Sequence, residues 1–228
     1  MVSLNQIDLR TTAKSKMSAA VFLTLRDRIV YLDYPQNFLL TEQQLCEEFG
    51  VSRTPLREAI FKLESMNLVR SVPRYGTFVT SIDAKEIRDT YVVKANLESL
   101  AGEAAAERIT SSDAAQLERI TDTLIKVAKE GNIREMFDCD FKFHETIWKA
   151  TENPVLFDFL ENIHARCLRF CIASTPKESW GIDNASEVAE ICDAITGKKK
   201  EKAANLLKAH NMQFLALIKD RVSQPFEN

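Results

Sequence analysis

The chain has 228 residues, of which 45% are hydrophobic and 28% are charged, and its formal net charge at pH 7 is −3. The hydrophobic content is sufficient for well-packed hydrophobic cores, and we expect two domains, residues 1–81 and 82–228. Residues 1–82 hold 10 basic and 8 acidic residues, so the remainder holds 20 and 25. A protein that binds phosphate backbones in bulk would be more basic, so the charge excludes that class and fits a few well-placed contacts, doubled in a dimer.

No segment of the sequence reads as a membrane span or a secretion signal. The first eighteen residues lack the apolar core of a signal, and no later stretch approaches eighteen uncharged apolar residues. We therefore expect a cytoplasmic protein. An odd number of cysteines without framework spacing indicates reduced thiols. These cysteines are Cys46, Cys139, Cys167, Cys171 and Cys192.

The first informative element is a short helix expected to begin at Thr41. Thr41 and Gln44 have the spacing of a capping box, which satisfies backbone N–H groups of the first turn. Leu45 and Phe49 lie on the buried stripe of this helix. Gly50 can adopt the left-handed conformation that ends a helix, so a tight turn follows.

A second helix is expected directly after this turn, with Ser52 as its N-cap. Its apolar stripe predicts the side that faces the core and consists of Leu56, Ala59, Ile60 and Leu63. The opposite face of the first two turns presents Arg53, Thr54 and Arg57. Arginine can bond bidentately to guanine N7 and O6 or reach a phosphate, which the positive end of a helix also attracts. This face therefore has the chemistry of a DNA-reading surface.

Two short strands are predicted next, at residues 68–72 and 77–80, after Asn67 ends the helix. The tip between them consists of Pro73, Arg74, Tyr75 and Gly76. Two isolated arginines are more simply explained as a solvated helix face. Here the turn, the caps, the arginine pair and the hairpin follow one another within residues 41–79, which predicts a winged helix-turn-helix that binds double-stranded DNA.

The predicted domain resembles the DNA-binding domain of the GntR family of bacterial transcription regulators, over about residues 18–80 and in the runs GVSRTPLREAIFKLESMNLV and RYGTFV. In that family the two arginine positions read bases or phosphates, and the wing glycine approaches the minor groove. The resemblance and the face described above give the expected DNA-binding residues as Gln43, Ser52, Arg53, Thr54, Arg57, Arg74, Tyr75 and Gly76. Residues 32–38 lack the glycine and the Pro-Gly pair usual in the family, which we interpret as a variant loop.

From residue 82 onward few glycines or prolines interrupt long segments of helical period, so we predict an all-helical bundle. Asp83 with Glu86, and Asn132 with Glu135, form capping boxes, and Asn153 precedes a proline at a helix start. The expected helices span residues 83–108, 111–130, 132–150, 153–175, 183–196 and 199–222. A loose loop is expected at residues 175–185.

The segment DFKFH places Asp140 and His144 four residues apart on a largely apolar helix face. A carboxylate and an imidazole there need a partner or a ligand. His210 lies on another inward stripe, flanked by Leu206, Leu207, Phe214 and Leu217. The three side chains are candidate ligands of a divalent metal with open positions. A buried ion pair of Asp140 with His144, and a hydrogen-bonded core His210, are the simpler alternative.

The run DFKFHETIWKATENPVL resembles the D-x-x-F-H segment of the FCD effector domain, found in the FadR branch of GntR regulators, and the resemblance extends over about residues 84–219. In many FCD domains one Asp and three His bind zinc, nickel or another divalent ion, which helps to hold a carboxylate effector. The resemblance therefore implies that Asp140, His144 and His210 bind such a metal.

Two positions depart from the FCD pattern. Val188 stands where the family usually has the fourth histidine, so water, the effector carboxylate or Cys192 would have to complete the site. Lys94 stands where the family often has an arginine that clamps the effector, and lysine keeps the charge but loses the fork. We still assign Lys94 to effector binding. His164 matches no ligand position and is expected to be an ordinary core or rim histidine.

We therefore expect a mostly α protein that is a ligand-responsive transcription repressor and not an enzyme. It would bind a palindromic operator as a homodimer and a small, carboxylate effector through its bundle. One alternative is a metal-dependent hydrolase or lyase, for which the sequence offers no convincing general base. Another is a DNA-binding protein whose bundle is only a dimer clamp.

Overall fold

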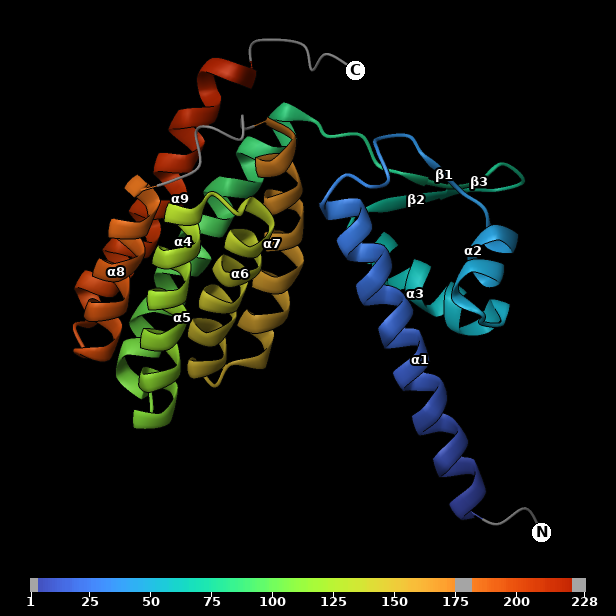
Figure 1. Cartoon of the computed structure of the whole chain (residues 1–228), viewed down its shortest axis with the longest axis horizontal. Coiled ribbons are helices and arrows are strands. Elements are labelled where there is room, and N and C mark those ends of the chain that lie inside the picture. The colour runs from blue at the N-terminus through green and yellow to red at the C-terminus, as the bar shows by residue number, and fades with distance from the viewer. Residues whose placement is uncertain (1–3, 175–181, 223–228) are drawn as a thin grey trace. The chain divides into compact units, whose positions relative to one another are not determined.

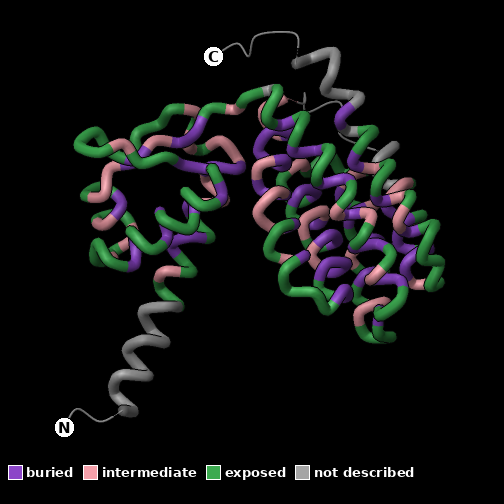
Figure 2. Tube along the Cα trace, turned by 180° about the vertical axis from the view of Figure 1, so that it is seen from behind, coloured by how far each residue is buried: buried purple, intermediate pink, exposed green. Residues whose placement is uncertain are grey.

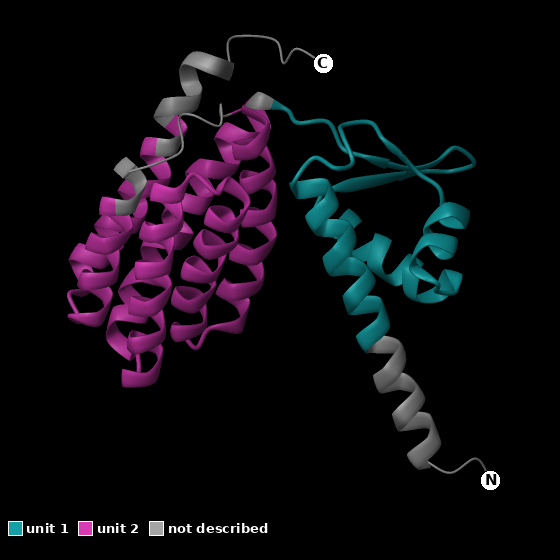
Figure 3. Cartoon of the chain, in the orientation of Figure 1, with its two compact units in different colours: residues 1–83 teal, residues 84–228 magenta. Residues whose placement is uncertain are grey.

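The computed structural model describes the backbone of residues 4–174 and 182–222, and the side chains of residues 16–83, 85–174, 186–213 and 215. The chain forms two compact units, Met1–Asp83 and Ala84–Asn228 (Figure 3). In both units the buried residues gather where the helices and strands face one another (Figure 2). Each unit therefore has its own core.

The first unit is a winged helix-turn-helix, as predicted (Figure 1). Its elements are α1 (Leu4–Val30), β1 (Leu39–Leu40), α2 (Glu42–Phe49), α3 (Arg53–Ser65), β2 (Val69–Val72) and β3 (Gly76–Val79). The strands form an antiparallel sheet in the order β1-β3-β2, with Val69 opposite Val79 and Leu39 opposite Phe78. The strand β1 was not predicted, because two residues carry no alternation of hydrophobic and polar side chains.

The helix α3 packs on α1 and buries its predicted apolar stripe of Leu56, Ala59, Ile60 and Leu63. On α1, Leu25 and Ile29 are fully buried. Burying an aliphatic side chain stabilises a fold by about 1.5 to 3 kcal/mol, so this stripe fixes which face of α3 turns outward. As a result, Arg53 and Arg57 lie on the exposed face of α3.

The turn between α2 and α3 lies where it was predicted, but among the residues that the structure describes the predicted side-chain caps of the two helices do not form. Gly50 ends α2 in the left-handed conformation, with φ at 61°. Thr41 and Ser52 occupy the N-cap positions of α2 and α3, but within the described residues neither side chain accepts a capping hydrogen bond. The capping box was therefore wrong: the Thr41 hydroxyl donates to Oε1 of Gln44, at 2.5 Å, and the two side chains satisfy each other.

Residues 32–38 lack the glycines usual in the family, and non-glycine residues adopt the turn conformation instead. Leu32 and Asn37 take the left-handed conformation, with φ at 64° and 62°, which costs a non-glycine residue free energy. Stacking of Tyr34 on Phe38, with ring centroids 4.8 Å apart, and a 2.7 Å hydrogen bond from Arg28 to the Tyr34 hydroxyl hold the loop. The loop is a variant that closes the same fold.

The second unit is all-helical in the part of the chain that the structure describes, as predicted. Its helices are α4 (Ala84–Arg108), α5 (Ser111–Glu130), α6 (Ile133–Ala150), α7 (Pro154–Ser174), α8 (Ile182–Thr196) and α9 (Lys200–Val222). The helix α4 is central, because it packs against α6, α7, α8 and α9. The predicted loop at 175–185 lies partly outside the described residues, which resume at residue 182 with the first turn of α8.

Side-chain caps fix the starts of three bundle helices. The carbonyl oxygen Oδ1 of Asn132 accepts from the backbone N–H of Glu135 at 3.3 Å, and Oδ1 of Asn153 accepts from that of Leu156 at 3.1 Å. Thr110 caps α5 in the same way. Both predicted asparagine caps are confirmed, and each orients a helix that carries part of the buried polar cluster described below. Among the described residues, no helix is both long and apolar enough to span a membrane.

Candidate functional site

The outer face of α3 presents the side chains that the sequence assigned to DNA. Arg53, Thr54 and Arg57 are all exposed, and they lie on the first two turns of the helix. Arg57 is held by Glu42 of α2 through two hydrogen bonds, from Nε to Oε1 at 2.7 Å and from Nη2 to Oε2 at 2.9 Å. On α2, Gln43 is exposed and its amide donates to Glu47 at 3.1 Å. The surface is accessible, and Arg53 presents a cation at the start of α3.

The wing tip is exposed as well. Arg74 has a left-handed backbone with φ at 69°, and the Tyr75 side chain is 76% exposed. Gly76 has φ at 122°, and a Cβ added there would lie 2.7 Å from Cδ1 of Leu39. Leu39 can move aside, but the positive φ strains any other residue, so the backbone of the wing itself favours glycine here.

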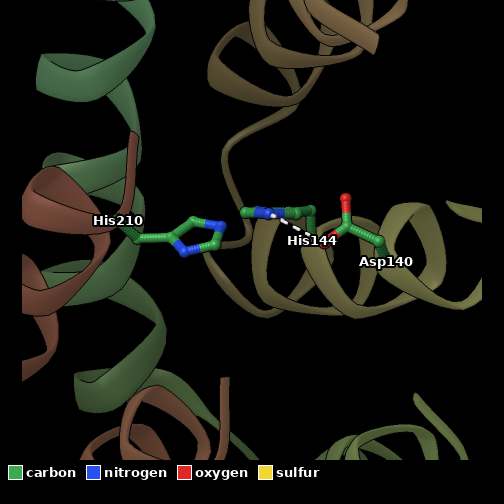
Figure 4. A group of neighbouring side chains, drawn as sticks. All are labelled: Asp140, His144 and His210. Carbon is green, nitrogen blue, oxygen red and sulfur yellow. Dashed lines mark ion pairs between the residues drawn. The ribbon is translucent and has the colours of Figure 1, made fainter. Parts of the chain in front are cut away.

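The bundle brings together the three candidate metal ligands. Asp140 and His144 project from α6 toward His210 of α9, and one ring nitrogen of His210 lies on the side of His144 (Figure 4). One potential ligand atom from each residue lies within 4.8 Å of the others. His144 is buried, and its Nε2 is 3.9 Å from Oδ1 of Asp140. That distance is too long for a direct hydrogen bond.

This donor set fits a divalent metal. Zinc is bound by histidine nitrogen and carboxylate oxygen at about 2.0 to 2.2 Å, so atoms 4.8 Å apart or less can reach one ion after small side-chain adjustments. Two nitrogens and one oxygen also suit nickel. Three protein ligands leave coordination positions for water or a further oxygen ligand.

A buried charged network lies beside His144. Glu98 of α4 is fully buried, and its Oε1 is 3.1 Å from Nδ1 of His144 and 3.4 Å from Nζ of Lys94. Oε2 of Glu98 accepts from the Trp148 indole at 3.1 Å, and Lys94 donates to Oδ1 of Asn211 at 2.5 Å. Burial alone would raise the pKa of Glu98, but the nearby imidazole of His144, the charge of Lys94 and the hydrogen bond from Trp148 hold it well below its usual value. The carboxylate is therefore ionised, and the Lys94 ammonium and the Trp148 indole N–H offset its burial.

His210 also has a carboxylate neighbour. Its Nδ1 is 3.1 Å from Oε2 of Glu187 on α8. Reasoning from the sequence missed both Glu98 and Glu187. The spacing of Lys94 and Glu98, four residues apart on one helix, was a usable signal for the first, and nothing local pointed to the second.

The remaining positions discussed from the sequence have clear places. Val188 is fully buried. Cys192 is buried, and among the described residues the metal-competent group does not include it. His164 of α7 is buried, with its ring 5.5 Å from that of His144, so it packs against a candidate ligand. Lys94 is buried and is engaged by Glu98 and Asn211.

Comparison with known proteins agrees with both halves of the chain. A family model described as bacterial regulatory proteins of the gntR family matches residues 17–79, and the FCD domain matches residues 89–213. The solved structure of E. coli McbR/YncC superposes with a TM-score of 0.80 at 20% sequence identity, covering 90% of this chain and 98% of that one. This likeness extends the shared fold over both units.

Two curated relatives are transcription regulators. The chain is 30% identical over 173 residues to the uncharacterized HTH-type transcriptional regulator YdhC of Bacillus subtilis (strain 168), which covers 75% of this chain and 77% of that protein. It is 32% identical over 157 residues to the galactonate operon transcriptional repressor of Escherichia coli (strain K12), with 60% of this chain and 67% of that protein covered. The chain belongs to the GntR family of bacterial transcription regulators, with an FCD domain after its winged helix-turn-helix, and is therefore a regulator and not an enzyme.

Proposed function

We propose that this protein is a repressor that binds a palindromic operator as a homodimer, and that its bundle binds a small carboxylate through a divalent metal. The observation that carries the proposal is the pairing of an exposed arginine face on α3 with a cluster of Asp140, His144 and His210, of which His144 is buried and the other two are half-buried. An inert second domain gives no reason for these three side chains to converge. The cluster supports a sensing role.

The DNA contacts are proposed residue by residue. Arg53 and Arg57 contact base edges or phosphates, and Ser52 and Thr54 at the start of α3 contact phosphates, which the helix N-terminus attracts. Gln43 contacts DNA from α2. Arg74, Tyr75 and Gly76 of the wing lie along a groove. The exposure of all eight side chains or backbone positions supports this assignment.

A carboxylate effector suits the cluster of Asp140, His144 and His210 chemically. The open positions of a metal held by Asp140, His144 and His210 accept carboxylate oxygens. An ammonium has three N–H donors. Lys94 donates one to Asn211 and forms an ion pair with Glu98, so we propose that a remaining donor binds the effector. The galactonate operon named for one relative concerns a carboxylate, which agrees with this class of ligand.

Exposed apolar residues support the homodimer. On α4, Val93 and Leu100 are each 50% exposed and lie seven residues apart on one helix face. On α7, Val155 and Phe159 are 63% and 60% exposed and lie four residues apart. Faces of this kind are covered in symmetric dimers, and a two-fold axis in the protein matches a palindromic operator.

The test is a binding titration with the full chain. Labelled duplexes that tile the DNA beside its own gene are titrated at fixed salt, with and without Zn²⁺ or Ni²⁺ and the carboxylates handled by the neighbouring enzymes. We expect one palindrome to bind at least tenfold more tightly than the other duplexes, which is about 1.4 kcal/mol, and one carboxylate to change that affinity. Equal affinity for every duplex would contradict the operator. An operator that no metal or carboxylate affects would favour a bundle that serves only as a dimer clamp, an outcome that Val188 in place of the fourth histidine makes worth testing.

A further inference from the structure

We infer that Glu98 and Glu187 are positioning residues that turn the two histidines of the cluster toward a shared metal. The inference rests on the metal site proposed above. It adds two carboxylates from α4 and α8 that would not touch the metal themselves. Among the described residues, the group whose ligand atoms lie close enough for one ion holds Asp140, His144 and His210 and neither glutamate.

At His144 the two ring nitrogens have different surroundings. Nδ1 lies 3.1 Å from Oε1 of Glu98, although among the described residues neither atom makes a hydrogen bond in this side-chain arrangement, and Nε2 lies 3.9 Å from Oδ1 of Asp140. Glu98 cannot easily rotate away, because Lys94 and the Trp148 indole hold its two oxygens. Glu98 therefore lies on the Nδ1 side of the His144 ring, and Nε2 lies on the side of Asp140.

At His210 a glutamate from a different helix lies beside Nδ1 and makes a hydrogen bond with it. Nδ1 lies 3.1 Å from Oε2 of Glu187. The other ring nitrogen is the one on the side of His144 (Figure 4). Glu187 precedes Val188 in the chain, so α8 contributes a carboxylate to His210 at the place where it lacks a histidine for the metal. The helix α8 therefore contributes to the site through Glu187.

The repetition has a chemical meaning. A neutral imidazole has one N–H and one lone pair, and a carboxylate beside Nδ1 takes the N–H and leaves the lone pair on Nε2. Metal-binding histidines commonly donate their second nitrogen to a carboxylate in this way, which fixes the tautomer and raises the basicity of the ligand. Both rings then present Nε2 lone pairs to the space beside Asp140. A carboxylate lies beside Nδ1 of each ring, an arrangement that suits a metal site.

The first experiment reads the tautomers directly. The chain has three histidines, so a long-range ¹⁵N–¹H spectrum of the metal-free full chain with ¹⁵N-labelled histidine is simple, and His144→Ala, His164→Ala and His210→Ala assign it. We expect the proton on Nδ1 of His144 and His210, and we expect Glu187→Gln to change the signals of His210 and not those of His144. A proton on Nε2 of either ring in the unmodified chain would overturn the inference, whether or not the protein binds metal.

The second experiment measures metal affinity by competition with a chromophoric chelator, using Zn²⁺ and Ni²⁺. Loss of an outer carboxylate typically weakens metal binding about 10- to 100-fold, and we expect this for Glu187→Gln. Glu190→Gln, an exposed glutamate on the same helix, is the matched control and should bind like the unmodified chain. If the unmodified chain binds no metal, the proposed metal site fails and the positioning role fails with it. If it binds metal and Glu187→Gln binds as tightly as Glu190→Gln, only the positioning role fails.

Glu98→Gln is a supporting variant, because it leaves the buried Lys94 without its carboxylate and can unfold the bundle. Its helicity is therefore measured first by circular dichroism. A folded Glu98→Gln is expected to lose metal affinity as Glu187→Gln does. Full metal affinity in a folded Glu98→Gln would overturn the role of Glu98.

Discussion

Arg57 and Glu42 form a bidentate pair between α3 and α2, with parallel N–H···O hydrogen bonds of 2.7 and 2.9 Å. The pair occupies the Nε edge of the guanidinium and leaves its terminal edge directed outward. The hydrogen bond to Arg57 lowers the pKa of Glu42, so this carboxylate is ionised at neutral pH. Glu42 therefore restricts Arg57 to one orientation and also places a negative charge near the proposed path of DNA phosphates.

Glu42→Gln should reduce discrimination more than it reduces binding. The variant frees Arg57 and removes a charge that repels phosphate, so affinity for unrelated duplex rises or stays level while affinity for the operator falls. We expect the ratio of the two to fall about tenfold, the size of one bidentate base contact. Fluorescence anisotropy against both duplexes at one salt concentration measures it. An unchanged ratio would mean that Glu42 does not position Arg57 for reading bases.

His144→Ala should separate sensing from DNA binding. His144 lies in the bundle, and the proposed DNA contacts lie in the other unit, so operator affinity without effector should change by less than about twofold, within the usual additivity error. The shift caused by the effector should disappear, and removing the metal from the unmodified chain with a chelator should have the same effect. Loss of operator binding in His144→Ala with helicity preserved would contradict this division.

Cysteine labelling tests the packing of the bundle. Cys139, Cys167, Cys171 and Cys192 are buried and Cys46 is half-buried. Burial raises the pKa of Cys167 to about 11 and that of Cys171 well above its usual value. Because the thiolate is the reactive form, a raised pKa keeps these thiols protonated and unreactive at neutral pH.

We therefore expect one fast-reacting thiol in the native protein and five after unfolding, followed with a chromogenic disulfide reagent. The Cys46→Ser variant should have no fast-reacting thiol. Two or more fast thiols in the native protein would show that the bundle opens more easily than its packing implies.

Gly102→Ala should destabilise the bundle although alanine favours helices. A Cβ at Gly102 would lie 2.6 Å from Cδ1 of Leu207 and 2.9 Å from the carbonyl oxygen of Ala203, so α4 and α9 would have to separate. Overpacking costs about 1 to 3 kcal/mol, which exceeds the gain of about 1 kcal/mol in helix propensity. Urea unfolding measures the net loss, with Glu103→Ala on the exposed side of the same turn as control. A gain in stability for Gly102→Ala would show that the two helices are not in close contact.

Local chemistry made much of the fold predictable. Gly50 and the caps Asn132 and Asn153 act within a few residues of themselves, so spacing alone located the helix ends. The left-handed conformation of Leu32 could not be predicted, because a leucine adopts it only when the surrounding structure requires it. The hydrogen bond from Thr41 to Gln44 was missed for a related reason, since the Thr41 hydroxyl can pair either with the backbone of its own helix or with the Gln44 side chain.

The candidate site was predictable in its residues and not in its surroundings. Helical period showed that His144 and His210 face inward, and the resemblance to the FCD domain paired them. Periodicity does not say which residue of another helix lies behind an inward ring. Glu98 and Glu187 are brought to the two imidazoles only by the packing of α4 on α6 and of α8 on α9.

The most direct test of the account compares two arginine variants in one operator titration. Arg53→Ala removes an exposed side chain from the proposed DNA face, and Arg119→Ala removes one from the exposed side of α5 in the bundle. We predict that Arg53→Ala weakens operator binding about 5- to 150-fold, the range for one specific base contact, while Arg119→Ala binds like the unmodified chain and both variants stay folded. Equal operator affinity for Arg53→Ala and Arg119→Ala would contradict the claim that this face of α3 reads DNA.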